Sequence, residues 1–307
     1  MSISPKMVAC LLATVALAAT GCGADLSPGG ELVSVGIAGG ETISAFYDAL
    51  IQFTVDTVEV EIFVRGLRNR PSEDLREGFE TQIASLSYRK QFAHRLTTTY
   101  TALGELLRVD ASKDVQAEVE SLVGSLAKIP QLPVIGAIVP SNVVGPIAGE
   151  LAAWRQSRDV RRGVQLVVNV LDRFAKLYER EGPAYTSIAQ QRANNIGTLV
   201  DLVISEPTVV LPRSMKMMIE SLELDFSNLP KDQPSGLSSI NAFKQLARVR
   251  AEQRALATAT AGGSIGRALV LSVDINRTYS AGRRPSLVQV RAAWDQAKLD
   301  VDRMKRP

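Results

Sequence analysis

Few residues of this chain belong to the types that usually carry enzymatic or metal chemistry. The 307 residues include two cysteines, Cys10 and Cys22, and a single histidine, His94. A hydrolase triad would have to use His94 or do without histidine, and a zinc site would need carboxylates for almost all its other ligands. His94 lies in a helix-like stretch beside Ala93 and Arg95, so we interpret it as a surface or hydrogen-bonded histidine.

Common catalytic and nucleotide-binding motifs do not occur in the sequence. It contains no G-x-S-x-G elbow, P-loop, H-E-x-x-H pair or EF-hand loop. The run from Gly262 to Gly266 is rich in glycine, but no predicted strand precedes it. Glu59 and Glu61 cannot share a helix face, and no other spacing marks a pair of carboxylates for acid–base work. We therefore predict no catalytic, cofactor-binding or metal-binding residues, with an enzyme of unknown type as an alternative.

The N-terminus has the three parts of an export signal. Lys6 supplies a positive charge, residues 7–19 form an uncharged run rich in Leu, Val and Ala, and small residues follow up to Gly21. The apolar run is too short to span a bilayer, which takes about 20 residues. We predict a signal peptide over residues 1–21. An ordinary signal cut after Ala18 or Ala19 is the alternative.

The four residues Ala19-Thr20-Gly21-Cys22 resemble the lipobox of bacterial lipoproteins, with alanine where leucine is commonest. The resemblance implies that the Cys22 thiol receives a diacylglycerol, that the signal is cut before it, and that the new amine is acylated, for example with palmitate. Gly23 stands where aspartate retains many enteric lipoproteins in the inner membrane, so by analogy we expect an anchor in the outer membrane of a bacterial envelope. Cys10 would be lost with the signal.

The composition indicates a globular protein. Hydrophobic residues make up 46% and charged residues 22%, and the 286 residues that follow a 21-residue signal suffice for one large domain or two smaller ones. The 35 basic and 32 acidic residues are too evenly balanced to indicate nucleic-acid binding. Aromatic residues, at 5%, argue against a β-rich fold.

The hydrophobic pattern predicts an all-α fold, an elongated bundle of long antiparallel helices with coiled-coil-like seams. Residues 22–40 contain six glycines and read as a lipidated flexible tether, with a packed loop or strand as the alternative. The helical domain then covers residues 41–307, with a possible sub-boundary near 206–238. The seam of the second helix has polar interruptions at Gln82 and Arg89. The helices are expected over residues 42–70, 72–108, 112–129, 149–180, 183–204, 237–260, 265–279 and 286–304, with a short Met-rich helix near Met215.

No residue between Ile129 and Gly149 is charged, although four prolines argue against a membrane-spanning helix. We expect a hairpin-like apolar tip between two long helices, followed by a tryptophan and several arginines that suit lipid headgroups. This arrangement resembles, in architecture only, the α-helical pore-forming toxins of the cytolysin A type. The alternative is a buried crossover followed by a solvated helix face. The residues of this possible membrane or partner tip are Val134, Ile135, Ile138, Val139, Val143, Val144, Ile147, Trp154, Arg155, Arg158 and Arg162.

The sequence thus predicts a non-catalytic lipid-anchored envelope protein with a helical scaffold or partner-binding domain. Its expected partners are membrane lipid, through the acyl anchor, and a protein of unknown identity. The first alternative is a membrane-active protein that inserts the apolar tip into a bilayer.

Overall fold

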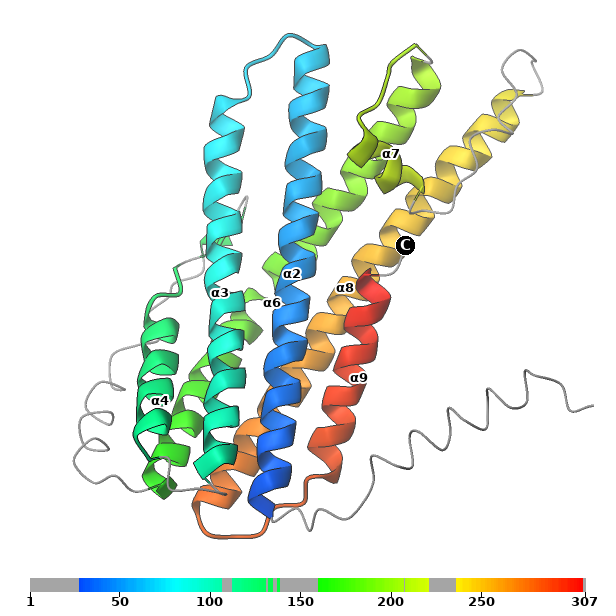
Figure 1. The fold of residues 1–307 in the computed structure, drawn as a ribbon. Helices are drawn as coiled ribbons and strands as arrows, with labels where there is room; N and C mark the ends of the chain where they lie inside the picture. The colour runs from blue at the N-terminus through cyan, green and yellow to red at the C-terminus, as the bar shows by residue number, and fades with distance from the viewer. Residues whose placement is uncertain are drawn as a thin grey trace, which may run out of the picture.

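The computed structural model describes residues 28–130, 132–134, 137–138, 160–220 and 236–305, except residues 107–111 and 207. Within these ranges the chain is an all-α bundle, as the hydrophobic pattern predicts, with one two-residue strand pair (Figure 1). The elements are α2 (Pro28–Leu67), α3 (Glu73–Leu106), α4 (Ser112–Ala127), β1 (Pro133–Val134), β2 (Ala137–Ile138), α6 (Val160–Ser205), α7 (Arg213–Glu220), α8 (Gly236–Ser280) and α9 (Val288–Lys305).

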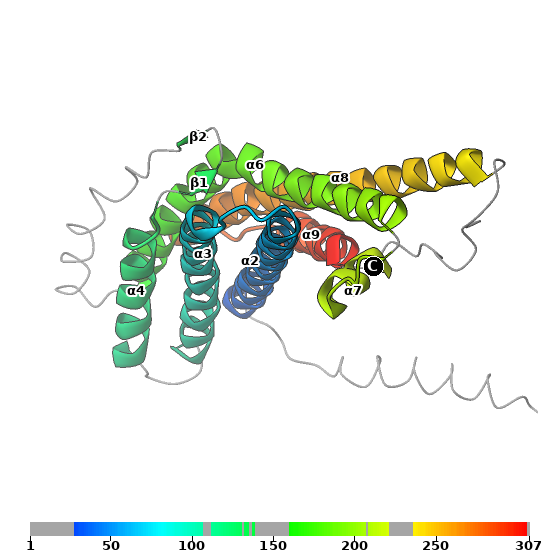
Figure 2. The same ribbon diagram turned by 90° about the horizontal axis from the view of Figure 1, so that it is seen from above.

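The long helices pack in two layers. Helices α2, α3 and α4 lie side by side, α6 and α8 cross behind them as a pair, and α9 packs against both α8 and α2 (Figure 2). The first part of α8, drawn in yellow, extends past the other described helices. The buried apolar residues of these helices form one continuous core.

The predicted seam of α2 faces the core along most of the helix. Ile43, Phe46 and Leu50 are fully buried and Val60 almost so, while Leu67 at the end of the helix is 46% exposed. The seam of α3 is likewise buried, including its two polar positions, Gln82 and Arg89. The three-and-four spacing thus identified the inward faces, because each apolar stripe has to be covered by another helix.

The flexible tether predicted for residues 22–40 is wrong from Pro28 onward, because α2 begins there. Its glycines serve close packing. A Cβ on Gly36 would lie 2.3 Å from the ring of Tyr100, and one on Gly39 would lie 2.9 Å from Trp294. Only a residue without a side chain allows these aromatic rings to approach the backbone so closely, and the packing outweighs the low helix propensity of glycine.

Two predicted helix breaks do not occur. Pro183 lies inside the continuous helix α6, and Gly262-Gly263 lie inside α8. An interior proline costs about 3 kcal/mol through its lost N–H and a clash with the preceding turn. The side chains on both sides of Pro183 are buried, including Glu181, Tyr185 and Ile188, so tertiary packing holds the two halves of α6 in line.

One segment of the described chain meets the length and composition of a membrane-spanning helix, namely Ile240–Ser280 in α8. In the bundle 44% of its most apolar window is buried, against α6 and α9 among other elements. This is weak support for a span, since a core helix passes the same test.

Candidate functional site

A fully buried ion pair lies in the core between α3 and α6. The guanidinium of Arg89 donates through Nε to Glu181 at 2.8 Å, and through Nη2 to the other Glu181 oxygen and to the carbonyl of Pro130, the latter at 3.0 Å. Its Nη1 donates to the carbonyl and the hydroxyl of Ser85 at 2.6 and 2.8 Å. All five N–H groups of the Arg89 guanidinium therefore have acceptors, which a buried guanidinium requires.

Two tyrosines extend this network. The hydroxyl of Tyr185 donates to Glu181 at 2.6 Å, and the hydroxyls of Tyr47 and Tyr185 lie 2.8 Å apart. Burial raises the pKa of both tyrosines, and the Glu181 charge adds to this. Burial alone would lower the pKa of Arg89, but its hydrogen bond and attraction to Glu181 raise it overall. The two tyrosines and Arg89 therefore keep their protons at neutral pH.

The tyrosine rings form part of an aromatic cluster whose outer side faces a groove between α6 and α8. The Tyr178 ring packs at tilted angles against the rings of Phe46, Phe174 and Tyr185, with the centroids of Tyr178 and Tyr185 5.2 Å apart. Its hydroxyl is buried without a hydrogen-bond partner in the described structure. A Cβ on Gly262 would lie 3.7 Å from this hydroxyl, so the glycine-rich face of α8 passes directly over the ring.

The groove between α6 and α8 has a volume of about 880 Å³. Apolar and small residues form its walls, including Ala175, Gly262, Val270 and Leu271, and charged residues stand at its rim. One of these charged residues, Arg277 on α8, forms an ion pair with Asp172 on α6, with 3.7 Å between Nη2 and Oδ1. A mostly apolar depression with a charged rim suits an apolar surface of another molecule.

The outer face of α8 carries several exposed apolar side chains. Leu246, Val249, Leu256 and Val270 are between 44% and 67% exposed. Val249, Leu256, Gly263 and Val270 follow one another at seven-residue spacing, so they form one stripe along the helix. We call these four residues together with Leu246 the α8 stripe. A heptad stripe on an exposed face is the pattern that a second helix covers.

His94, the one histidine, is exposed on α3, and its ring nitrogen lies 3.3 Å from the hydroxyl of Ser44. It borders a polar surface cavity of about 660 Å³ between α3 and α4. The structure thus agrees with a surface, hydrogen-bonded histidine. Among the described residues, no three His, Cys, Asp or Glu side chains come together as they would around a metal ion.

Most residues of the predicted apolar tip, like Cys22, lie outside the described residues, namely Ile135, Val139, Val143, Val144, Ile147, Trp154, Arg155 and Arg158. Val134 and Ile138 belong to the strands β1 and β2, in which Val134 pairs with Ala137, and Arg162 lies in the first turn of α6. Just before the strands, Leu132 is fully buried, and β1 contacts α3 and α6. The entrance to the tip is therefore part of the core, and the role of the tip itself stays a prediction.

The Arg89–Glu181–Tyr185 network was not predicted from the sequence, although Arg89 stands out there as a polar interruption of an apolar seam. A charged residue at an inward position of an apolar seam was the available signal, because it must find a buried partner. Nothing in the spacing identified Glu181, which stands beside the presumed helix break at Pro183. The α8 stripe was also missed, since the expected break at Gly262-Gly263 divided it.

Comparison of the chain with protein-family models, with curated proteins and with solved structures gave no match.

Proposed function

We propose that this chain is a non-catalytic, lipid-anchored protein of a bacterial envelope, held in the outer membrane through Cys22, whose helical domain binds a protein partner. The anchor is supported by the export-signal pattern and the lipobox-like residues before Cys22. The helical domain supplies the binding surface, and the α8 stripe is the single observation that carries this part of the proposal.

The start of α2 gives the anchor a geometric consequence. Five residues separate Cys22 from Pro28, so six residue-to-residue steps of at most about 3.6 Å each limit the distance to roughly 20 Å. A lipid on Cys22 would therefore hold the first turn of α2 close to the membrane surface. The 40 residues of α2 rise about 1.5 Å each, so the other end of the helix is roughly 60 Å away.

The partner chemistry follows from the shape of the α8 surface. Exposed valines and leucines at heptad spacing favour an amphipathic helix that runs along α8. Gly263, in the middle of the stripe, leaves room for a close approach between the helices.

The anchor is tested by palmitate labelling of cells that express the wild type or Cys22→Ser, together with mass spectrometry of the mature N-terminus. We expect label in the wild type alone and a mature chain that begins with acylated Cys22. An unmodified Cys22, or a chain that keeps its leader, would exclude the lipid anchor. Neither result would bear on the proposal that α8 binds a partner.

The binding surface is tested by photocrosslinking in living cells, with a benzophenone amino acid in place of Leu256 or, as a control, Leu299. Leu299 is a matched site, because it is 51% exposed but lies on α9. We expect a discrete adduct from position 256 only, which disappears when Val249→Glu places a charge in the stripe. The mass of the adduct shows whether the partner is another protein or a second copy. No adduct, or the same adduct from both positions, would overturn the proposal.

A further inference from the structure

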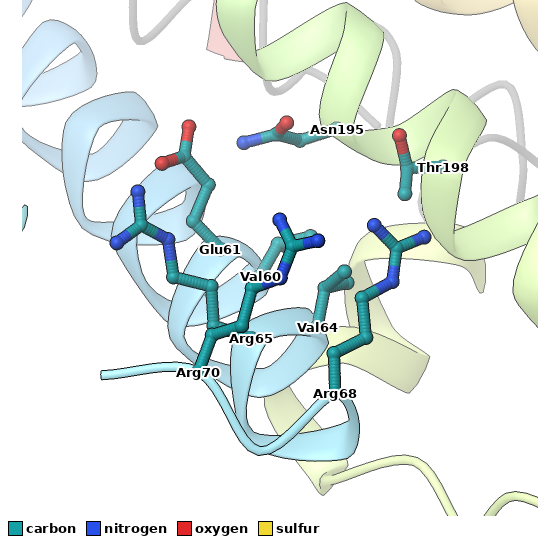
Figure 3. Close-up of a pocket in the computed structure, with 8 residues that line it drawn as sticks. All are labelled: Val60, Glu61, Val64, Arg65, Arg68, Arg70, Asn195 and Thr198. Atoms are coloured by element: carbon teal, nitrogen blue, oxygen red, sulfur yellow. The ribbon is translucent and has the colours of Figure 1, made fainter. Parts of the chain in front are cut away.

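Three arginines surround a small cavity at the far end of α2. Arg65 belongs to the last turn of the helix, and Arg68 and Arg70 follow in the turn that leaves it; Asn195 and Thr198 of α6 stand opposite (Figure 3). The cavity has a volume of about 200 Å³. Figure 3 shows the guanidinium of Arg68 directed toward Thr198 and that of Arg70 directed toward Glu61, with Arg65 between them.

The backbone fixes the positions of Arg68 and Arg70. The N–H of Asn69 donates to the carbonyl of Gly66 at 3.1 Å, and the N–H of Arg70 donates to the carbonyl of Arg65 at 3.0 Å. Asn69 has a φ of 52°, in the left-handed region. These features define a Schellman motif, which ends the helix and satisfies its last carbonyls. The arginine side chains are therefore not needed to cap those carbonyls, although the helix dipole favours positive charge here.

The side chains around the cavity carry a net positive charge. Arg65 donates to Asp74 at 3.2 Å and to the carbonyl of Pro71 at 3.1 Å. No side-chain hydrogen bond or ion pair joins Arg68 or Arg70 to the rest of the described chain. The three arginines exceed the two nearby carboxylates, Glu61 and Asp74, by one positive charge. Three neighbouring guanidinium groups, of which those of Arg68 and Arg70 make no side-chain hydrogen bond within the described chain, match the oxygen atoms of a phosphate group.

We infer that the cavity bounded by Arg65, Arg68 and Arg70 is a binding site for a phosphate group. The phosphate could be free, as inorganic phosphate or a soluble phosphomonoester, or part of a lipid headgroup. The cavity lies at the C-terminal end of α2, roughly 60 Å from the first turn of this helix, which follows Cys22 in the chain. A soluble phosphate and a lipid headgroup would therefore reach the cavity from different surroundings. This inference does not depend on the proposed anchor or on the α8 stripe.

The first test titrates inorganic phosphate into the full purified chain by isothermal calorimetry, at low and constant ionic strength with chloride as the balancing ion. We expect saturable binding by the wild type. Arg68→Gln/Arg70→Gln should weaken it at least tenfold, because each charge-assisted pair is worth about a factor of ten or more. The phosphate affinity of Arg68→Lys should lie between those of the wild type and the double variant, since lysine keeps the positive charge but lacks the planar set of guanidinium N–H donors.

The matched control is Arg283→Gln/Arg284→Gln, which removes the same charge from an exposed turn between α8 and α9. It should bind phosphate like the wild type. Circular dichroism and thermal unfolding in chloride check that all variants are folded. Absence of saturable phosphate binding to the wild type, or equal weakening by the control pair, would overturn the inference.

A second arm separates the sources of the phosphate by sedimentation with vesicles of phosphatidylcholine, with and without phosphatidylglycerol. Binding to phosphate that does not extend to the anionic vesicles assigns the site to a soluble phosphate. Binding to the anionic vesicles that is lost in Arg68→Gln/Arg70→Gln and kept in Arg283→Gln/Arg284→Gln assigns it to a headgroup.

Discussion

The glycines of α2 and those of α8 look alike in sequence but do opposite things in the fold. In α2, Gly36 and Gly39 lie under the rings of Tyr100 and Trp294, where even a methyl group would collide. In α8, Gly262 and Gly266 leave 3.7–3.9 Å between a hypothetical Cβ and Tyr178, which is ordinary contact distance. The first set seals the packing of α2 against α3 and α9, and the second set leaves the α6–α8 side open as a groove.

This difference separates a sealed side of the molecule from an open one. The sealed side contains the Arg89–Glu181 pair and the tightest helix contacts, so we expect substitutions there to cost the most stability. The open side carries the groove and the α8 stripe, where substitutions should change binding with little loss of stability.

The largest loss is expected for Arg89→Met. It leaves the carboxylate of Glu181 buried without its ion partner, which costs about 3–5 kcal/mol. Urea unfolding followed by circular dichroism measures the change. The double variant Arg89→Met/Glu181→Leu should recover most of the loss, because apolar residues replace both charges. If the double variant were no more stable than Arg89→Met, the ion pair and its hydrogen bonds would contribute more to the free energy of unfolding than the mutual compensation of two buried charges.

Gly36→Ala should destabilise the protein by about 1–3 kcal/mol, because the new methyl group forces the Tyr100 ring to move in a packed core. The ring is also held by its hydroxyl, which donates to Asn276 at 3.0 Å. The same unfolding measurement applies. If Gly36→Ala were neutral, α2 and α3 would not be packed as tightly as the structure shows.

Tyr185 and Tyr178, neighbouring rings of one aromatic cluster, should respond differently to loss of the hydroxyl. Tyr185→Phe removes a hydrogen bond to a buried carboxylate and should cost about 1.5–3 kcal/mol. Tyr178→Phe removes a buried hydroxyl without a partner and should be neutral or stabilising by up to about 1 kcal/mol. Equal losses in thermal and urea unfolding would mean that the Tyr178 hydroxyl has a partner.

The smallest effect, and a favourable one, is expected for Gly266→Ala. Alanine fits the available space and restricts the unfolded chain, so the helix should gain about 0.5–1 kcal/mol. Gly197→Ala on α6, with nothing within 4 Å of its Cβ, is the matched control and should gain a similar amount. A loss at Gly266 alone would show that the groove is narrower than described.

Much of the architecture could be predicted from the sequence, because inward positions such as Ile43, Phe46 and Leu50 repeat at helical spacing. Helix ends were predicted less well. Pro183, Gly262 and the glycines before Thr42 look like breaks locally, and only contacts from distant segments, such as Arg89 to Glu181, keep these helices continuous. The groove could not be predicted, since it depends on which face of α8 remains uncovered when α6 and α9 have packed against it.

The most direct test of the α8 surface is the reactivity of a cysteine in place of Leu256 in the mature lipoprotein, in which Cys10 has left with the signal and the Cys22 thiol is acylated, probed with a bulky maleimide. The account predicts rapid labelling in the purified protein and strong protection in freshly isolated envelope fragments, whereas a cysteine in place of Leu299 labels equally fast in both. Equal labelling of position 256 in both preparations would contradict the claim that α8 binds a partner.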